Sequence, residues 1–425
     1  METQCPRQPE KNPEETWENL KLADSIRMMP SDESIGSQIR KLRESAGLRA
    51  VDLAQTLNVD PAVVSNIEHD KRQVKARELA TIAEFLGVSQ LAILDPDSLL
   101  ARLPVAPRTT AGEPVEPSAI KRLNALADLH QVLDDAGRSS SPHLGDVPNV
   151  KELQWLDAAN RLAAWADSEL SHLEGNDDPF TNLIEAIENR FHIDIMVDHI
   201  DTESLVGASI TDPSFPMILL NAKQPRPRAL FTLAHELCHV LVNDGEQMIW
   251  HHDLDPRNDK ERMANAFAAA LAMPERQVKE MLGDSGVEAD TLANMLVKFG
   301  VSFESLTYRM HNLQIINAAG RDQLIEIGWS GLVEQLDNDH LRSSLIAAYG
   351  SQPERRPPRF LTQRAWEGWR AGIIGAAPLA SLLGQSVEDT LLLNQSDHQM
   401  TVSDIGSMSD SKDDDVLASF NANPI

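Results

Sequence analysis

Apolar residues recur at intervals of three and four along most of the chain, the spacing that places them on one face of an α-helix. Near the N-terminus this pattern is interrupted by turn residues, among them Gly47, Asn58 and Gly87. Interruptions this close together allow only short helices. We therefore predict a module of five helices, at residues 35–46, 51–57, 62–69, 76–86 and 90–94.

The middle of the chain combines helical patterns with two short apolar runs. These runs, 192–197 and 217–220, have the length and the β-branched content of buried strands. A longer apolar run, 229–242, has the length of a helix. Further helical patterns occupy 119–136, 150–173, 322–349 and 361–393. The sequence therefore predicts a mainly α fold with one small α+β domain and a helical C-terminal extension.

The apolar run 229–242 contains His235 and His239, four residues apart. Residues with this spacing share a helix face, so both imidazoles can reach one metal ion. Glu236 lies between them, where its carboxylate can take a proton from metal-bound water. The pattern indicates a zinc hydrolase. The simpler alternative is a pair of structural histidines beside an exposed glutamate.

A catalytic zinc site needs a third protein ligand and leaves a fourth position for water. Glu261 is the best candidate, because it lies on the first turn of the next predicted helix. Spacing alone leaves several other residues of this region open as ligands. They are Asp253, Asp255, Asp259, His251 and His252.

The segments around these residues resemble the ImmA/IrrE family of zinc metallopeptidases. The resemblance extends over residues 178–317, and it is carried by 219–221, 231–237, 261–268, 271–274 and 308–313. It implies that His235, His239 and Glu261 hold one Zn²⁺ and that Glu236 is the general base. It also implies a protein substrate, a repressor that carries a helix-turn-helix.

One residue departs from the family pattern: Cys238 stands where the family usually has glycine. A small thiol suits the packing of a buried position. Its alternative role, so close to the metal, is an oxidation-sensitive switch.

Zinc in such a site lowers the pKa of bound water towards roughly 7 and polarises the scissile carbonyl. A further donor is expected to stabilise the oxyanion, and the candidates are Tyr308, His311, His252 and His251. An exposed edge of the predicted strands could hold the peptide by backbone pairing. The alternative is that both strands only complete the core.

The N-terminal module resembles the XRE-type helix-turn-helix of phage-repressor-like regulators, through residues 35–44, 53–57, 64–68 and 83–88. The resemblance implies that the helix beginning near Pro61 enters the major groove of double-stranded DNA. Seven residues are predicted to contact DNA. They are Arg40, Arg43, Ala62, Ser65, Asn66, Lys71 and Arg72.

The start of this helix offers few hydrogen-bonding groups to base edges, and Asp60 is better suited to capping the helix than to binding DNA. In favour of DNA binding, residues 33–94 carry eight Lys and Arg against eight Asp and Glu, whereas the whole chain has a net charge of −27. A locally neutral module leaves basic patches for phosphate contacts. The alternative is a protein-interaction module with solvated helix faces.

These assignments divide the chain of 425 residues into seven segments. We predict a flexible N-terminus at 1–32, the helix-turn-helix at 33–95, a proline-containing linker at 96–118, a helical bridging region at 119–175, the metallopeptidase domain at 176–318, a helical extension at 319–394 and a disordered acidic tail at 395–425. Within the extension, 378–387 resembles half of another helix-turn-helix.

Only two cysteines, Cys5 and Cys238, occur in the chain, which argues against a disulfide framework. The start of the sequence lacks the pattern of a signal peptide, and no apolar run has the length of a membrane span. We expect a cytoplasmic protein with no membrane partner. A homodimer is its candidate assembly.

Together these features predict a zinc-dependent regulatory endopeptidase with a DNA-binding helix-turn-helix, which cleaves a repressor-type protein in a stress response or in the control of a mobile element. One alternative is a transcriptional regulator whose zinc domain senses or scaffolds without proteolysis. Another is a binding partner of the toxin–antitoxin type. The intact Glu236 favours the enzyme, because a scaffold has no need of a base between its ligands.

Overall fold

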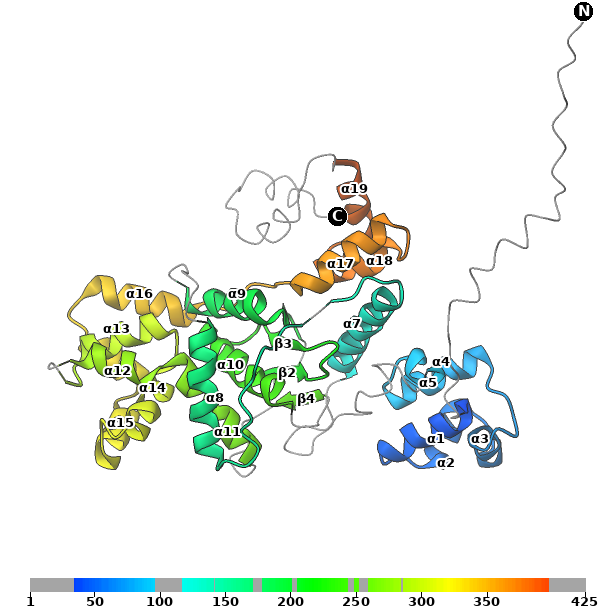
Figure 1. Ribbon diagram of the computed structural model, residues 1–425, viewed down its shortest axis with the longest axis horizontal. Helices are drawn as coiled ribbons and strands as arrows, with labels where there is room; N and C mark the ends of the chain where they lie inside the picture. The colour runs from blue at the N-terminus through cyan, green and yellow to red at the C-terminus, as the bar shows by residue number, and fades with distance from the viewer. Residues whose placement is uncertain are drawn as a thin grey trace, which may run out of the picture.

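The computed structural model describes residues 34–95, 117–140, 142–170, 178–200, 205–243, 248–251, 259–283 and 286–396. Helices surround one small sheet (Figure 1), which confirms the predicted mainly α fold with a small α+β part. The predicted N-terminal segment 1–32 and most of the linker and acidic tail lie outside the described residues, as do His252, Asp253 and Asp255.

The N-terminal module has the five predicted helices, each within one residue of its expected bounds. They are α1 (Ile35–Ser45), α2 (Ala50–Leu57), α3 (Pro61–Glu68), α4 (Ala76–Leu86) and α5 (Gln90–Leu94). Asp60 caps α3 as expected, since its Oδ1 accepts a hydrogen bond from the Ala62 amide at 2.8 Å. At Gly36 a β-carbon would lie 2.1 Å from the Ile67 carbonyl oxygen, so only glycine allows α1 to approach α3 this closely.

The sheet has four strands in the order β1-β3-β2-β4. They are β1 (Asp194–Asp198), β2 (Gly207–Ile210), β3 (Met217–Asn221) and β4 (Met248–His251). β1 pairs with β3 in parallel, and the other pairs are antiparallel. The first predicted strand begins later than expected, because His192 ends the preceding helix in the left-handed conformation, with φ of 54°. β2 and β4 were not predicted, because neither has a clear β pattern.

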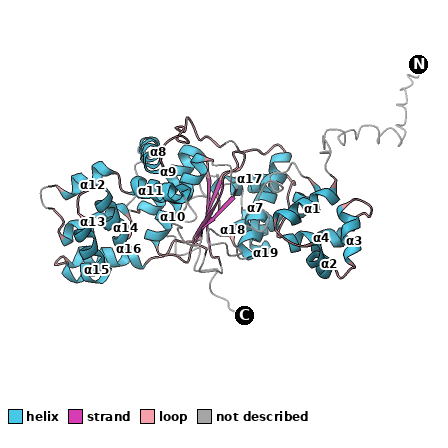
Figure 2. Cartoon of the chain, turned by 90° about the horizontal axis from the view of Figure 1, so that it is seen from below, coloured by secondary structure: helices cyan, strands magenta, loops and turns pink. Residues whose placement is uncertain are grey.

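One face of the sheet is covered by helices that share a large apolar core (Figure 2). These are α8 (Trp155–Leu170), α9 (Pro179–Phe191), α10 (Arg226–Val242) and α11 (Asp259–Ala272). The core continues into α12 (Glu275–Leu282), α13 (Ala289–Phe299), α14 (Phe303–Asn312), α15 (Ala318–Gln335) and α16 (Asp339–Gly350). Ile218 and Leu220 of β3 point to this face.

The opposite face is covered by α7 (Pro117–Asp135), α17 (Arg359–Arg370) and α18 (Ala376–Leu383), followed by α19 (Val387–Ser396). Met217 and Leu219 of β3 contribute to this second core, in alternation with the residues of the first. Ala92 of α5 is buried in the same core. The helix-turn-helix module and the sheet are therefore joined through α7.

The C-terminal extension is fastened to β1. The backbone of Arg356 exchanges hydrogen bonds of 2.9 Å with that of Val197 in β1. Arg356 thereby occupies the edge of β1 that faces away from β3. Buried Asp194 accepts hydrogen bonds from the amides of Phe360 and Leu361 at the start of α17, at 2.7 and 3.1 Å. The extension therefore completes the sheet's second face. Its helix α19 reaches Ser396, two residues into the predicted tail.

Candidate metal centre

α10 brings the two histidines of the motif together in the core. The Nε2 atoms of His235 and His239 lie 3.2 Å apart, and both side chains are buried. This part of the helix has no solvent-exposed face, since it is covered by the sheet on one side and by α11 on the other. Two imidazoles turned towards each other in an apolar core need a shared partner, because burial of polar groups is unfavourable without one.

α11 supplies a carboxylate to the same place. Glu261 has one oxygen 3.3 Å from Nε2 of His235 and the other 3.6 Å from Nε2 of His239. Among the other residues considered as third ligand, Asp259 points to solvent and pairs with Arg262. Of the cysteines, histidines and acids that the structure describes, only His235, His239 and Glu261 form a cluster able to hold a metal ion.

The three side chains fit zinc in type and in separation. Zinc bonds of about 2.0–2.2 Å in a tetrahedral arrangement place the ligand atoms roughly 3.3–3.6 Å apart. The observed separations of 3.2, 3.3 and 3.6 Å agree with this requirement. Two imidazoles and one carboxylate are also one of the donor sets found in catalytic zinc sites, and they leave a fourth position for water.

Asn265 holds one of the histidines in place. Its Oδ1 lies 2.9 Å from Nδ1 of His235, so that Nδ1 carries the proton and Nε2 keeps its lone pair for a metal. Asn265 lies four residues after Glu261, on the same face of α11. Asn265 was not predicted as a site residue, although its spacing from the candidate ligand is a usable signal in the sequence.

Glu236 is fully buried and is contacted from the sheet. Ser209 of β2 donates a hydrogen bond from its Oγ to Oε2 of Glu236, at 2.7 Å. A β-carbon at Gly207 would lie 2.5 Å from Thr232 and 3.2 Å from Glu236 Oε1, so glycine permits the close approach of β2 to α10. Gly207 and Ser209 were not predicted as site residues, because β2 itself was not predicted.

Comparison with known proteins gives a family match for two segments of the chain. Residues 188–311 match the IrrE N-terminal-like domain family, and residues 39–89 match the helix-turn-helix family. The chain therefore carries an IrrE-like metallopeptidase-family domain and a helix-turn-helix domain. This confirms both resemblances.

The relatives include two metalloproteases and a transcriptional regulator. The radiation response metalloprotease IrrE of Deinococcus radiodurans is 34% identical over 104 residues, 23% of this chain and 32% of that protein. The IrrE of Deinococcus deserti is 32% identical over 105 residues, 37% of its length. The HTH-type transcriptional regulator RamB of Mycobacterium tuberculosis is 22% identical over 328 residues, 66% of this chain and 65% of the regulator. The chain thus spans about a third of the metalloproteases and just under two thirds of the regulator.

The other predicted residues of the IrrE-like domain are less closely defined. Tyr308 and His311 both lie on α14; the Tyr308 side chain is 44% exposed and His311 is half-buried. Their role at an oxyanion stays a prediction. Cys238 is buried in the first core, which fits a packing role. Within the described part of the chain, each helix is too short or too polar to cross a membrane.

In the helix-turn-helix domain, most of the predicted DNA contacts lie at the surface. Ala62, Ser65 and Asn66 are exposed on α3, and Lys71 is exposed just beyond it. All three of the predicted arginines form ion pairs within the domain. Arg40 forms an ion pair with Glu44 at 2.9 Å, and Arg72 forms one with Glu78 at 2.7 Å.

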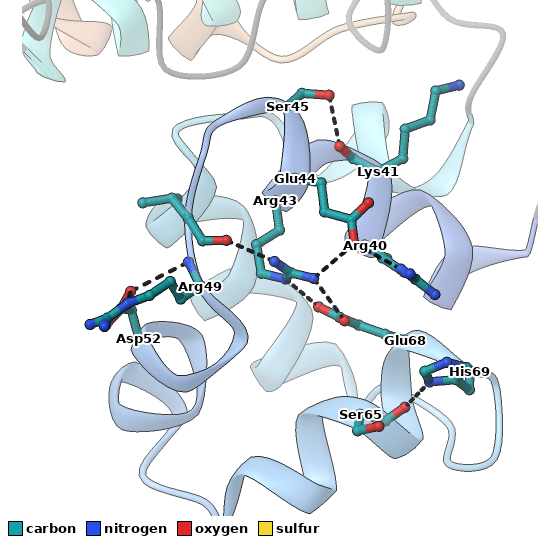
Figure 3. Close-up of polar contacts among 11 residues, drawn as sticks. Arg40, Lys41, Arg43, Glu44, Ser45, Arg49, Asp52, Ser65, Glu68 and His69 are labelled. Atoms are coloured by element: carbon teal, nitrogen blue, oxygen red, sulfur yellow. Dashed lines mark hydrogen bonds and ion pairs between the residues drawn. The ribbon is translucent and has the colours of Figure 1, made fainter.

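Arg43 must be removed from the predicted DNA contacts. Its guanidinium is buried and donates to both carboxylate oxygens of Glu68, at 2.6 and 3.1 Å, and to the Leu48 carbonyl at 2.7 Å (Figure 3). The paired Glu68 raises the pKa of Arg43. Arg43 therefore joins α1 to α3 inside the domain, and its donors are not directed at a phosphate.

Proposed function

We propose that this protein is a zinc-dependent regulatory endopeptidase with a DNA-binding helix-turn-helix domain, and that it cleaves a repressor-type protein to control transcription. The observation that carries the proposal is the meeting of Glu261 with both histidines of α10, with Glu236 buried beside them. The combination of an IrrE-like domain with a helix-turn-helix domain supports a regulatory role.

In this proposal His235, His239 and Glu261 hold the zinc ion. The chemistry that zinc supplies is polarisation of the scissile carbonyl and acidification of water. Glu236 accepts the proton of the attacking water and delivers it to the leaving amine. Ser209 keeps the Glu236 carboxylate oriented for this transfer, because its hydroxyl donates to one oxygen at 2.7 Å.

The substrate would bind as an extended chain along β4. Within the described residues β4 pairs with β2 alone, whereas the outer edge of β1 is occupied by Arg356. A peptide that pairs with a sheet edge gains backbone hydrogen bonds whatever its sequence. The helix-turn-helix domain would meanwhile hold the protein at DNA through α3 and raise the local concentration of a DNA-bound substrate.

The test compares the wild type with Glu236→Gln, each loaded with zinc and incubated with helix-turn-helix proteins encoded by neighbouring genes. Mass spectrometry would search for new termini on those proteins and on the chain itself. We expect fragments with the wild type only. Identical fragments with both proteins would reveal a contaminating protease and remove the support for catalysis.

A second candidate function is transcriptional regulation without proteolysis. The similarity to RamB favours it, because RamB is a transcriptional regulator and the similarity extends over 66% of this chain. In this case the zinc domain would act as a sensor or scaffold. Zinc-dependent binding to DNA, with no fragments from any partner, would select this candidate.

A further inference from the structure

The helices α18 and α19 repeat the geometry of α2 and α3, the helix pair of the helix-turn-helix domain. α2 and α18 both contain eight residues, and in each case three residues separate the helix from the next one, α3 or α19. The residue after each helix, Asn58 or Gly384, adopts the left-handed conformation, with φ of 52° or 70°. The segment 378–387 resembled only half of a helix-turn-helix, and α19 supplies the second half.

The hydrogen bonds of the two turns also correspond. The Val59 amide donates to the Ala54 carbonyl at 3.0 Å, and the Gln385 amide donates to the Ala380 carbonyl at 3.1 Å. A side-chain cap then starts the second helix: Asp60 for α3, and Ser386 for α19, whose Oγ accepts from the Asp389 amide at 3.0 Å. Such agreement at caps and turn defines the same local fold.

Packing follows the same positions. Leu53 and Ala54 are buried in α2, as are Leu379 and Ala380 in α18. The fourth residue of the second helix is fully buried in both pairs, as Val64 in α3 and as Thr390 in α19. The outward faces of α3 and α19 are therefore equivalent surfaces.

These equivalent surfaces carry different chemistry. α3 exposes Ala62, Ser65 and Asn66, whereas the matching positions of α19 are Glu388, Leu391 and Leu392. Leu391 is 47% exposed and Leu392 53% exposed. Carboxylates at the start of α19 repel phosphate, and leucines offer no hydrogen bonds to base edges, so this face is unsuited to DNA.

We propose that α19 is a protein-docking surface, and that its partner is an amphipathic helix with an apolar stripe flanked by Lys or Arg. Val387 and Leu391 form one stripe at helical spacing, and Glu388 lies beside it as an exposed anion. A second copy of this chain fits less well, since it would place like charges together and the chain is strongly acidic. α19 also lies at the periphery of the molecule, beyond α17 and α18 (Figure 1).

This inference stands apart from the proposed function, because docking needs neither zinc nor Glu236. The test uses the full chain and a fluorescent synthetic helix of about 18 residues, with a leucine stripe flanked by lysines. A matched peptide carries glutamates in place of the lysines. Binding would be followed by fluorescence anisotropy at low ionic strength.

Three variants separate the site from general attraction to an acidic protein. Val387→Ser combined with Leu391→Ser should weaken binding of the lysine peptide at least about tenfold. Leu156→Ser on α8 removes a leucine with the same 47% exposure and should have no effect. Glu388→Lys should shift preference from the lysine peptide towards the glutamate peptide.

Several outcomes would overturn the proposal. Equal binding by the wild type and the double variant would place the peptide elsewhere, as would equal loss in Leu156→Ser. If the double variant instead changed the sedimentation of the protein, a second copy would be the occupant. If deletion of residues 397–425 were needed to observe binding, the chain's own tail would be the occupant.

Discussion

Glu236 receives a hydrogen bond from Ser209, a residue 27 positions away on a strand that the sequence did not predict. We expect Glu236→Gln to reduce peptide hydrolysis about 10²–10⁴-fold, the contribution usual for a general base. The amide keeps the size of the side chain, so zinc content, measured by elemental analysis, should stay at the level of the wild type. A variant that lost both zinc and activity would assign Glu236 a structural role.

Removal of the hydroxyl at Ser209 should have a smaller effect. Ser209→Ala deletes one hydrogen bond to the Glu236 carboxylate, worth about 1.5–3 kcal/mol, and we expect a loss of kcat of at least about tenfold. KM should change little, because the hydroxyl contacts the base and not the substrate. An unchanged kcat would show that Ser209 does not position the base.

Asn265 is expected to act on metal affinity. Its contact with His235 fixes the tautomer that leaves Nε2 for zinc, so Asn265→Ala should weaken zinc binding about 10–100-fold. Competition with a chromophoric chelator measures this change. Asn294→Ala is the matched control, because the Asn294 amide donates to the carbonyl of Asp290 on an exposed part of α13, away from the metal centre. Equal zinc affinity in both variants would contradict the assignment.

Arg43 and Arg40 provide a contrast between a buried and an exposed arginine. Arg43→Ala leaves Glu68 buried without its main partner, and we expect a loss of about 1–3 kcal/mol in the free energy of unfolding of the helix-turn-helix domain. Arg40→Ala removes an ion pair at the surface and should not measurably change stability. Urea denaturation followed by circular dichroism would test both. An unaffected Arg43→Ala would return this residue to the predicted DNA contacts.

At the scale of elements, the junction between β1 and α17 depends on a buried acid. Burial, together with the neighbouring Glu188, raises the pKa of Asp194 to about 7. A folded-state pKa above the unfolded value favours the folded protein at low pH, and this contribution disappears as pH rises from about 4 to about 7. Asp194→Asn keeps an acceptor for the amides of α17. We therefore expect this variant to lose less stability over that pH range than the wild type does, as measured by thermal unfolding. Parallel pH profiles would contradict this prediction.

Helices and strands differed in how well the sequence predicted them. The five helices of the N-terminal domain follow from local periodicity and from turn residues such as Asn58 and Gly87. The strand β2 has no such signal, because Gly207 fits the limited space beside α10 and Ser209 serves a hydrogen bond to Glu236, and neither residue type favours a strand. The pattern at 322–349 also reads as one segment, but it forms α15 and α16, with Asn338 capping the second helix.

At the scale of the whole molecule, one apolar core joins the helix-turn-helix domain to the sheet. Ala92 of α5 shares this core with α7 and with Ala208 of β2, while the neighbouring Ser209 contacts Glu236 from the other face. The Asn124 side chain on α7 also donates to the Gly87 carbonyl at the end of α4, at 2.9 Å. These contacts provide a path by which stabilisation of the metal site can reach the packing around α5.

We expect added zinc to slow amide hydrogen exchange in α5 and α7 as well as in α10 and α11, because a ligand that binds the folded state protects every element that unfolds together with its site. Mass spectrometry of the full chain, with zinc or with a chelator, would measure it. Glu261→Ala should abolish the effect. Protection confined to α10 and α11 would show that the two domains are not coupled.

The sequence by itself determined the features that depend on neighbouring residues: two histidines on one helix turn, a glutamate between them, and the helices of a helix-turn-helix. Spacing along a helix fixes which side chains share a face, whatever surrounds it. The tertiary structure alone decided the meeting of Glu261 with His235 and His239, the contacts made by Ser209 and Asn265, and the use of Arg43 inside the domain. These depend on which distant segments pack together, because burial and hydrogen bonding decide whether a polar side chain serves the fold or a ligand.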